Sequence, residues 1–512
     1  MSAAPGPSAD HDADHDEDTA RLADLGYASH YKRDMSLWAN FSLGFTYLSP
    51  VVGVYALFGF SLAAGGPPMI WSLVVAGLGQ LLVALVFGEI VSQYPVSGGV
   101  YPWARRLWGR RWAWLSGWIY LVALLVTIAS VSYGAGPYAA SLLGIEPSAD
   151  HTIACALVIL AVATAINLSG TRNLARAAII GFAAELVGAL AVGIWLLATE
   201  RHHGAAALFD GFSTGGGGGY AGAFLAASLI GIFQYYGFEA CGDVAEEVRD
   251  PGRRIPKAMR MTIYVGGGAA LFVTFALVSA VADVGAVISG RDADPVTTVL
   301  TAAFGPVAVK VILGIVLISF VSCAMSLQAA ASRLAYAYAR DEMIAGSRAL
   351  ARFSAARRVP PYALLLAALV PAAVVLGSKL SADALTKIIS FASLGIYLGF
   401  QMVVLAALRA RLKGWRPAGR FTLGRWGLPV NVAALLYGVA AMVTMSWPRS
   451  PGRPWYDDYI VPLSGAVVIG LGLVYMAATR HYGRGDAPAG DAIPGAAPAG
   501  AAAPPPGPRT TA

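Results

Sequence analysis

Charged side chains are scarce in this chain of 512 residues, where Asp, Glu, Lys and Arg together make up 13%. A soluble domain carries about 25%. Hydrophobic residues reach 57%, and they run in blocks of about 20, the length that crosses a hydrocarbon core of roughly 30 Å. The shortage of charge therefore excludes a soluble enzyme and indicates a polytopic membrane protein.

Cysteine and histidine are also too few, or in the wrong places, for several kinds of site. The three cysteines, Cys155, Cys241 and Cys323, lie in or beside apolar spans, where they pack as small hydrophobes and form no disulfide framework. All seven histidines lie in tails or loops, so no intramembrane metal cluster is expected. No G-x-x-x-x-G-K-[ST] motif occurs, which excludes an ATP-driven pump. We expect neither enzyme activity nor a cofactor.

Between two polar tails the chain contains twelve apolar spans, and none shows the period-two alternation of barrel strands. The predicted fold class is therefore an all-α polytopic membrane protein with 12 transmembrane helices. The spans cover residues 37–61, 69–92, 112–141, 152–169, 174–198, 221–244, 261–286, 306–336, 360–377, 383–408, 427–447 and 459–479.

Both tails are predicted to be disordered. Residues 1–36 are polar and contain the acidic run Asp10–Asp18, and such a segment cannot bury enough apolar area to order itself. Residues 485–512 are rich in Ala, Pro and Gly, a composition typical of disordered segments.

Loop cations are distributed unevenly between the two sides of the membrane. One set of alternate loops holds 23 Lys and Arg residues and the other holds 6, with the tails and Lys310 left out. Because cytoplasmic loops are enriched in these residues, we expect the richer side to be cytoplasmic, with both termini inside and the protein in the plasma membrane. The cations of the richer side lie at 105–111, 172–176, 249–260, 333–358 and 409–425.

Two spans are interrupted by residues that break a helix. The first contains proline and glycine within Tyr47–Gly53, and the sixth has glycines on both sides of an acid within Gln234–Gly242. The two spans are five apart, so a unit of five helices that starts inside is followed by one that starts outside. Matching interruptions in two inverted halves indicate a transporter binding site. The alternative is that these residues only kink the helices and tune their packing.

Longer motifs follow spans 2 and 6 and end span 8. The first, Glu89–Trp103, reads E-x-x-S-x-Y-P-x-S-G-G-x-Y-x-W. The second and third join Tyr236–Ala240 to Ala245–Ala258, and Ser332–Arg333 to Ala339–Asp341. Over roughly residues 35–480 the chain resembles the amino acid–polyamine–organocation permeases, and its segment Phe41–Pro50 is most similar to their amino acid/choline branch.

This resemblance implies the LeuT-like fold, in which ten core helices form a 5+5 inverted repeat, helices 1 and 6 are discontinuous, and two peripheral helices follow. It implies secondary transport of a small molecule, an amino acid or a related amine, by alternating access. The transporter domain is then expected at 37–480, with repeats at 37–200 and 221–408 and peripheral helices 11 and 12 at 427–479.

The interrupted helices suit a zwitterionic substrate. Unwound backbone leaves N–H and C=O groups that must find partners in hydrocarbon. A carboxylate accepts from amides at a half-helix N-terminus, and an ammonium donates to carbonyls at a half-helix C-terminus. We predict the carboxylate at Ser49, Val51, Val52 and Gly53. The ammonium and side chain are predicted at Phe233, Tyr236, Gly237 and Phe238, although Phe233 and Tyr236 are equally consistent with ordinary packing.

Two acids lie at bilayer depth, Glu185 in span 5 and Glu239 in the interruption of span 6. An unpaired ionised acid there is costly, so each is protonated, paired or facing water. In relatives the position of Glu185 can hold a lysine that stands where sodium binds in sodium-coupled members. We therefore predict that Glu185 carries a coupling proton and that Glu239 contributes to the substrate site. The alternative is a pair of neutral acids hydrogen-bonded within the bundle.

Sodium coupling remains a second possibility, because Ser319, Ser322 and Ser326 of span 8 offer hard oxygen ligands. Serines at this spacing are also selected by close helix packing. Glu89 at the end of span 2 and Glu246 and Glu247 after span 6 are expected to pair with loop arginines, as structural or gating elements.

The sequence thus predicts a proton-coupled importer of an amino acid or amine that works within the lipid bilayer and without a nucleic-acid partner. An exchanger and a sodium-coupled symporter are the alternatives within transport. A nutrient sensor that does not transport is the alternative from another class, and such a protein usually brings a long additional domain.

Overall fold

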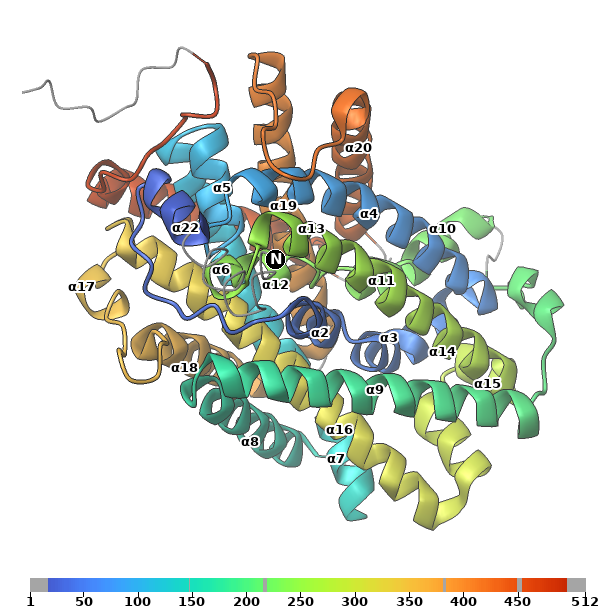
Figure 1. Cartoon of the computed structure of the whole chain (residues 1–512). Coiled ribbons are helices and arrows are strands. Elements are labelled where there is room, and N and C mark those ends of the chain that lie inside the picture. Colours follow the sequence, from blue (N-terminus) through green and yellow to red (C-terminus); the bar gives the residue numbers. More distant parts are fainter. Residues whose placement is uncertain (1–16, 147, 215–218, 381–383, 449–453, 495–512) are drawn as a thin grey trace, which may run out of the picture.

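The computed structural model describes residues 17–146, 148–214, 219–380, 384–448 and 454–494, which form helices joined by loops and contain no strand (Figure 1). The predicted all-α class is therefore confirmed. The longer helices are α2 (Leu37–Leu48), α3 (Pro50–Gly65), α4 (Ile70–Gln93), α6 (Arg110–Gly134), α8 (Ala149–Leu168), α9 (Thr171–Thr199), α13 (Pro251–Met261), α14 (Gly267–Ala280), α16 (Pro295–Arg340), α18 (Pro361–Gly377), α19 (Ala384–Leu412), α20 (Gly427–Ser446) and α22 (Ile460–Thr479).

Short helices lie at the ends of the bundle and at its interruptions. They are α5 (Val100–Leu107), α7 (Gly136–Leu143), α10 (Tyr220–Ala227), α11 (Leu229–Gln234), α12 (Ala240–Asp243), α15 (Val284–Ile288), α17 (Ser347–Leu350) and α21 (Trp455–Asp458), together with the π-helical turn Thr262–Gly266 between α13 and α14.

Ten helical segments in the described ranges are long and apolar enough to cross a membrane. Two shorter apolar helices, Tyr220–Gln234 and Pro361–Gly377, occupy the predicted sixth and ninth spans. The sixth is short because its helix stops at Gln234, where the interruption begins.

Both predicted interruptions are present in the backbone. α2 and α3 meet end to end at Ser49, whose φ of 41° lies in the left-handed region, and Pro50 begins α3 (Figure 1). Proline suits the first helical position because no helical N–H bond is lost there. The second interruption runs from Tyr235 to Glu239 between α11 and α12, with Gly237 at a φ of 118°.

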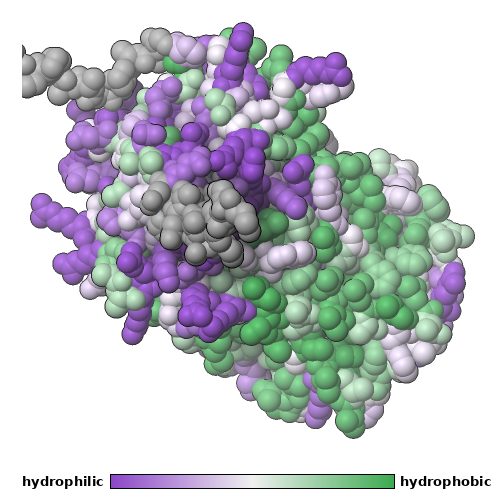
Figure 2. Space-filling model, in the orientation of Figure 1, coloured by the Kyte–Doolittle hydropathy of each residue, from purple (hydrophilic) through white to green (hydrophobic). Residues whose placement is uncertain are grey.

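The interrupted helices occupy the buried centre, and apolar side chains cover the outside. On α9, Ile180, Val187 and Ile194 recur every seven residues and are all more than 60% exposed. This spacing places them on one face of the helix, as expected for a surface that meets lipid. Figure 2 shows apolar residues over much of the molecule and hydrophilic residues gathered at one end. We call this the charged end; it carries α5, α13, α17 and residues 17–36.

The expectation of disordered tails is wrong for the parts that the structure describes. Residues 17–24 form a helix, and Leu22, Tyr27 and Tyr31 are buried. Residues 485–494 also pack at the charged end, where Gly490 N–H donates to Arg105 O at 2.8 Å. Average composition missed this because a few apolar side chains and backbone hydrogen bonds to the bundle suffice to order a short segment. Residues 1–16 and 495–512 lie outside the described residues.

Candidate binding site between two interrupted helices

The two interruptions are in direct contact. A Cβ atom placed on Gly237 would lie 2.6 Å from Leu48 N and 3.0 Å from Leu48 Cα, at the end of α2. Gly237 also has a positive φ, which L side chains rarely adopt. Only glycine therefore allows the second interruption to approach the first so closely.

The first turn of α3 has all of its amides occupied. Pro50 has no N–H, and Val52 N–H donates to the side chain of Ser49 at 3.2 Å. Val51 N–H donates to Glu185 Oε1 at 3.0 Å, and Gly53 N–H donates to Ser49 O at 3.0 Å. The amides predicted to bind a carboxylate are thus bound to groups of the protein itself.

Glu185 reaches this turn from α9 and is fully buried. Its Oε1 accepts from the Ser49 hydroxyl at 2.6 Å as well as from Val51 N–H. Its Oε2 has no hydrogen-bond partner among the described residues. The carboxyl group of Glu185 therefore lies at the N-terminus of a half-helix, the position that the helix dipole makes favourable for a negative charge.

The last carbonyls of α2 are also occupied. Cys323 of α16 donates its thiol to Tyr47 O at 3.2 Å. Gln234 donates its side-chain amide to Leu48 O at 3.1 Å and to Ser49 O at 3.4 Å. Gln234 Oε1 has no partner among the described residues and faces Gly53. Donors of the protein thus occupy the carbonyls at the C-terminus of this half-helix.

Glu239 holds the second interruption together. Its Oε2 accepts from Gly237 N–H at 2.7 Å, and its Oε1 accepts from the Tyr120 hydroxyl of α6 at 3.0 Å. Two of the predicted aromatic residues are neighbours here, since the Phe233 and Tyr236 ring centres are 5.2 Å apart. Phe238 packs against Phe400, with ring centres 5.5 Å apart.

The serines of span 8 already have neighbours in the bundle. Ser326 Oγ and Thr46 Oγ1 are 2.8 Å apart in a hydrogen bond between α16 and α2. Ser322 faces Gly181 of α9, and Ser319 donates to Ile315 O of its own helix at 3.1 Å. The structure thus brings Ser322, Ser326 and Glu185 to the junction of α2, α9 and α16.

Sequence reasoning missed several residues of the site. Gln234 is the first residue of the predicted interruption Gln234–Gly242, but no role was predicted for it. Nothing in the sequence around Tyr120 or Cys323 indicated that either contacts the interruptions. Asp243 lies one turn beyond Glu239 and is fully buried, and neither of its carboxyl oxygens has a hydrogen-bond partner among the described residues. Its spacing of four from Glu239 was a signal that could have been used, because residues four apart share a helix face.

Three acids predicted to be structural or gating residues form ion pairs near the charged end. Glu247 pairs with Arg333 at 2.8 Å, both fully buried, and also accepts from Thr171 Oγ1 at 2.5 Å. Glu246 pairs with Arg340 at 3.0 Å and accepts from Ser97 N–H at 3.1 Å. Glu89 pairs with Arg411. These contacts join α4 to α19, and the segments after α4 and α12 to α16.

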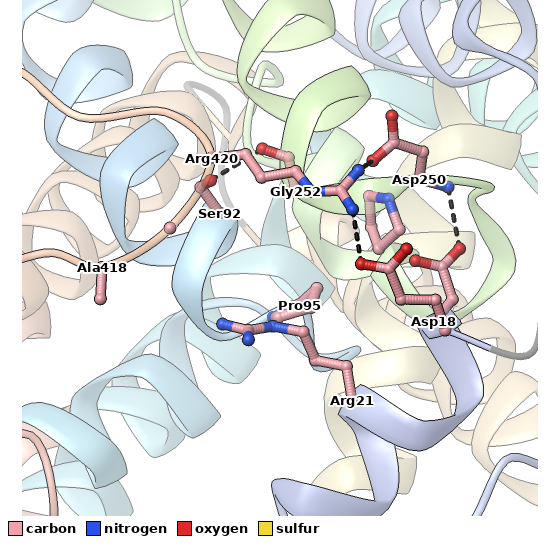
Figure 3. Close-up of a pocket in the computed structure, with 11 residues that line it drawn as sticks. Asp18, Arg21, Ser92, Pro95, Asp250, Gly252, Ala418 and Arg420 are labelled. Atoms are coloured by element: carbon pink, nitrogen blue, oxygen red, sulfur yellow. Dashed lines mark hydrogen bonds and ion pairs between the residues drawn. The ribbon is translucent and has the colours of Figure 1, made fainter. Parts of the chain in front are cut away.

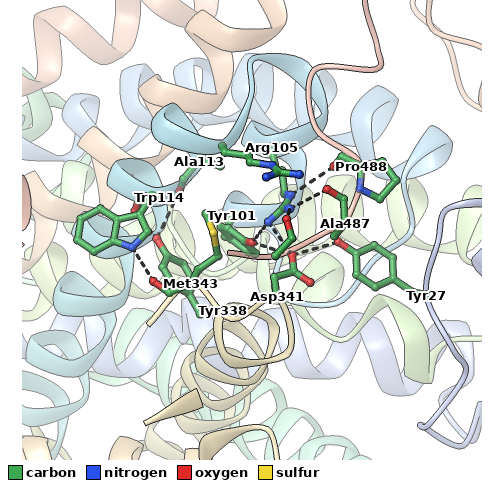
Figure 4. Close-up of polar contacts among 12 residues, drawn as sticks. Tyr27, Tyr101, Arg105, Ala113, Trp114, Tyr338, Asp341, Met343, Ala487 and Pro488 are labelled. Carbon is green, nitrogen blue, oxygen red and sulfur yellow. Dashed lines mark hydrogen bonds and ion pairs between the residues drawn. The ribbon is translucent and has the colours of Figure 1, made fainter. Parts of the chain in front are cut away.

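A second polar layer lies outside these pairs and is centred on Asp341 (Figure 4). Asp341 accepts from Tyr101 at 2.6 Å and from Tyr27 at 3.2 Å, and pairs with Arg105 at 3.3 Å. Arg105 in turn donates to Ala487 O at 2.7 Å. Burial and then the Asp341 carboxylate raise the pKa of both tyrosine hydroxyls, so they remain donors at any physiological pH.

A third group of ion pairs and hydrogen bonds connects the N-terminal segment to the loops of the charged end. Arg420, between α19 and α20, pairs with Asp250 at 2.8 Å and with Glu17 at 2.6 Å (Figure 3). Asp18 accepts from Asp250 N–H at 2.9 Å beside them. The described residues therefore close the charged end in layers, with the interrupted helices buried behind them.

Comparison with known proteins covers the whole bundle. The profile of the family described as amino acid permease matches residues 35–471. The chain is 29% identical to the amino-acid permease BAT1 homolog of Oryza sativa subsp. japonica, over 94% of this chain and 98% of that protein. It is 27% identical to the amino-acid permease BAT1 of Arabidopsis thaliana, over 91% and 96%. A manganese transporter of Eremococcus coleocola shares the fold, with a TM-score of 0.57 at 13% identity, over 87% of this chain and 93% of that one.

Proposed function

This chain belongs to the amino acid permease family, and on that premise we propose that it imports an amino acid or a related amine as a secondary active transporter. The observation that carries the proposal is the contact of two interrupted helices at the buried centre of a membrane-spanning bundle. Interrupted helices at this place are how transporters present backbone groups to a substrate. The relatives named as amino-acid permeases support the choice of substrate class.

We propose a topology of 12 spans in which residues 37–200 and 221–408 form the two inverted repeats and 427–479 the peripheral helices. The charged end is taken as cytoplasmic because it carries most of the loop cations, which places both termini inside and the protein in the plasma membrane. The resemblance of Phe41–Pro50 to the amino acid/choline branch stays a prediction.

The proposed substrate site comprises the first turn of α3 and the interruption between α11 and α12. Its residues are Ser49, Val51, Val52, Gly53, Phe233, Tyr236, Gly237, Phe238 and Glu239. Glu89, Glu246 and Glu247 belong to the contacts that close the cytoplasmic side. Opening these contacts on one side while the other side closes is the alternating access expected of the family.

We propose a proton as the coupling ion and Glu185 as its carrier. Glu185 is buried, has one oxygen without a hydrogen-bond partner in the described part of the chain, and lies at the junction of α2, α9 and α16. A carboxyl group there can take a proton from the acidic outer side and release it inside. Sodium is the alternative and would need the oxygens of Ser322 and Ser326, although Ser326 is already hydrogen-bonded to Thr46.

The test is uptake into vesicles that contain the purified protein, with the twenty radiolabelled amino acids supplied singly. A pH gradient, acidic outside, is expected to drive accumulation of at least one of them, more strongly as the external pH falls. Glu185→Gln should lose this accumulation and keep exchange, whereas Glu200→Gln, at the far end of α9, should behave as wild type. A sodium requirement without a response to pH would transfer the coupling role to Ser322 and Ser326. Exchange alone, without accumulation in any gradient, would make the protein an exchanger.

A further inference from the structure

The carboxyl group of Glu185 makes the contacts that a substrate carboxylate was predicted to make. It accepts one hydrogen bond from the Ser49 hydroxyl at 2.6 Å and one from Val51 N–H at 3.0 Å. The remaining amides of the first turn of α3 are bound to Ser49. No donor of this turn is left over, so a second carboxylate can bind only if Glu185 leaves.

Gln234 fills the corresponding position at the end of α2, where it acts as a donor. Its side-chain NH₂ donates to Leu48 O and Ser49 O, the carbonyls at which an ammonium group would donate. Glu185 and Gln234 both contact Ser49, one at its hydroxyl and the other at its carbonyl. An acceptor from α9, bound at the start of α3, and a donor from α11, bound at the end of α2, thus fill the two poles of a zwitterion site with groups of the chain itself.

Among the described residues, no cation acts on Glu185 that could hold the displaced glutamate as an ion. Glu185 faces α2, α3 and α16, and α9 packs further against α8 and α14. α2, α3 and α14 contain no charged residue, and α8 carries only Asp150 and His151 at its start. On α16 the titratable neighbour is the Cys323 thiol. Lys310 and Arg333 lie roughly 20 Å and 15 Å along the helix from Cys323 at 1.5 Å per residue.

From this arrangement we infer that substrate binding replaces Glu185 at the N-terminus of α3 with the carboxylate of the substrate, and that the displaced Glu185 takes up one proton. The inference rests on the proposed function and narrows the substrate to molecules that carry a carboxylate. The step balances, because Glu185 COO⁻ and one H⁺ from water become COOH, while the incoming carboxylate accepts the hydrogen bonds that Glu185 gave up. An amine without a carboxylate cannot replace Glu185 and is not a substrate.

Coupling then arises from competition at one site. A second carboxylate beside an ionised Glu185 would be repelled in a medium of low dielectric constant, so the proton and the substrate favour each other's binding. By linkage, the substrate dissociation constant should rise about tenfold per pH unit where Glu185 is ionised in the empty protein. Binding should therefore tighten as pH falls.

The experiment pairs each amino acid with the amine left when its carboxyl group is removed. Ethylamine serves for alanine, cadaverine for lysine and phenethylamine for phenylalanine. Binding to the full-length protein in lipid nanodiscs is measured by equilibrium dialysis between pH 5 and 9, and proton uptake by an indicator dye in weak buffer. Wild type should bind an amino acid but not its amine. In the pH range where Glu185 is ionised in the empty protein, proton uptake should approach one proton per amino acid bound.

Three variants complete the test. Glu185→Gln should bind the same amino acid without proton uptake and without a dependence of affinity on pH. Glu185→Ala removes the competing group, so at pH 8 it should bind about tenfold more tightly than wild type, a gain that a purely structural role would not produce. Glu200→Gln, directly after the end of α9 and outside the site, should match wild type.

Two results would overturn the inference while leaving the proposed function intact. One is an amine that binds as tightly as its amino acid. The other is proton uptake that persists in Glu185→Gln, and its loss in Asp243→Asn would then assign the proton to the buried Asp243. If the protein binds and transports none of the twenty amino acids and none of the three amines, the proposed function itself fails.

Discussion

Ser49 both interrupts the first span and hydrogen-bonds to Glu185. Its φ of 41° is left-handed, which costs a residue with a side chain about 1–3 kcal/mol. Its hydroxyl compensates by donating to Glu185 and accepting from Val52 N–H. Glycine would tolerate the backbone better but would leave Val52 N–H without a cap. A small side chain with a hydroxyl group meets both needs.

Gly237→Leu should abolish uptake while the protein still inserts into the membrane. A side chain at this position would collide with the backbone of Leu48, and its φ of 118° is unfavourable for any L residue. Uptake per molecule, normalised to the amount of protein in the membrane, is the measurement. Gly222→Leu is the matched control, because Gly222 lies in α10 with open space around its Cα. Normal transport by Gly237→Leu would rule out a substrate site at this contact.

Glu239→Gln should weaken substrate binding itself, in contrast to Glu185→Gln. Glu239 accepts from Gly237 N–H and from the Tyr120 hydroxyl, and an amide in its place keeps the size but loses the charge that strengthens both hydrogen bonds. We expect the dissociation constant to rise about tenfold or more, equal to about 1.4 kcal/mol. Equilibrium dialysis of both variants measures this dissociation constant. Equal affinities for Glu239→Gln and wild type would contradict the proposal that Glu239 belongs to the substrate site.

At the scale of elements, the charged end is closed by ion pairs that link different helices. Arg333 is on α16, and its partner Glu247 follows α12 and also binds Thr171 at the start of α9. Buried pairs contribute little net stability, yet removing one partner costs about 3–5 kcal/mol because the other charge is left buried. Because one broken pair leaves a buried charge, the ion pairs are expected to form together when the charged end closes and to break together when it opens.

Glu246→Gln should lower the rate of transport with little change in equilibrium substrate affinity. Glu246 binds Arg340 and Ser97 N–H, which are contacts of the closure and not of the interrupted helices. Losing the ion pair should shift the balance between open and closed forms. The maximal rate and the dissociation constant, measured on the same preparation, separate the two effects. A change confined to the dissociation constant would place Glu246 in the substrate site.

At the scale of the whole molecule, the two terminal segments meet at one surface. Arg106 of α5 pairs with Asp491 at 2.5 Å and donates to Leu25 O, so a single side chain contacts both segments. Residues 17–36 and 485–494 thereby cover the ion pairs that lie beneath them. The charged end depends on parts of the chain that are more than 450 residues apart in sequence.

Arg106→Ala should release both terminal segments. It removes the ion pair with Asp491 and the hydrogen bond to Leu25, and limited trypsin digestion should then cleave within residues 17–36 several-fold faster than in wild type. Arg111→Ala is the control, since Arg111 is exposed and close in sequence. Equal cleavage rates in the two variants would mean that Arg106 does not hold the segments.

Cysteine labelling tests the orientation of the molecule. In a Cys155→Ser background, where the other two cysteines are buried, Ala356→Cys at the charged end should react only when the reagent reaches the cytoplasm. Ser289→Cys, in the loop between α15 and α16, should react from outside in intact cells. Both positions are in described loops at opposite ends of the bundle. The reverse pattern would invert the topology and place the termini outside.

Much of the architecture follows from the sequence alone, because it depends on local physics. The length of apolar spans sets where helices cross the membrane, and Pro50 and Gly237 set where two of them break. Loop cations predict the orientation by the same local reasoning. These properties need no knowledge of which helix is next to which.

Only the tertiary structure decided which groups occupy the interruptions. From the sequence, Glu185 could be assigned to the fifth span and Gln234 to the sixth. The sequence did not show that Glu185 accepts from Val51 N–H or that Gln234 donates to Leu48 O. It also missed the order in residues 17–36 and 485–494. Such contacts depend on the rotation and depth of each helix, and hydropathy does not encode these, because lipid and the neighbouring helices are equally apolar. Rotation and depth are settled by close packing and by buried polar groups finding partners, and both require the complete bundle.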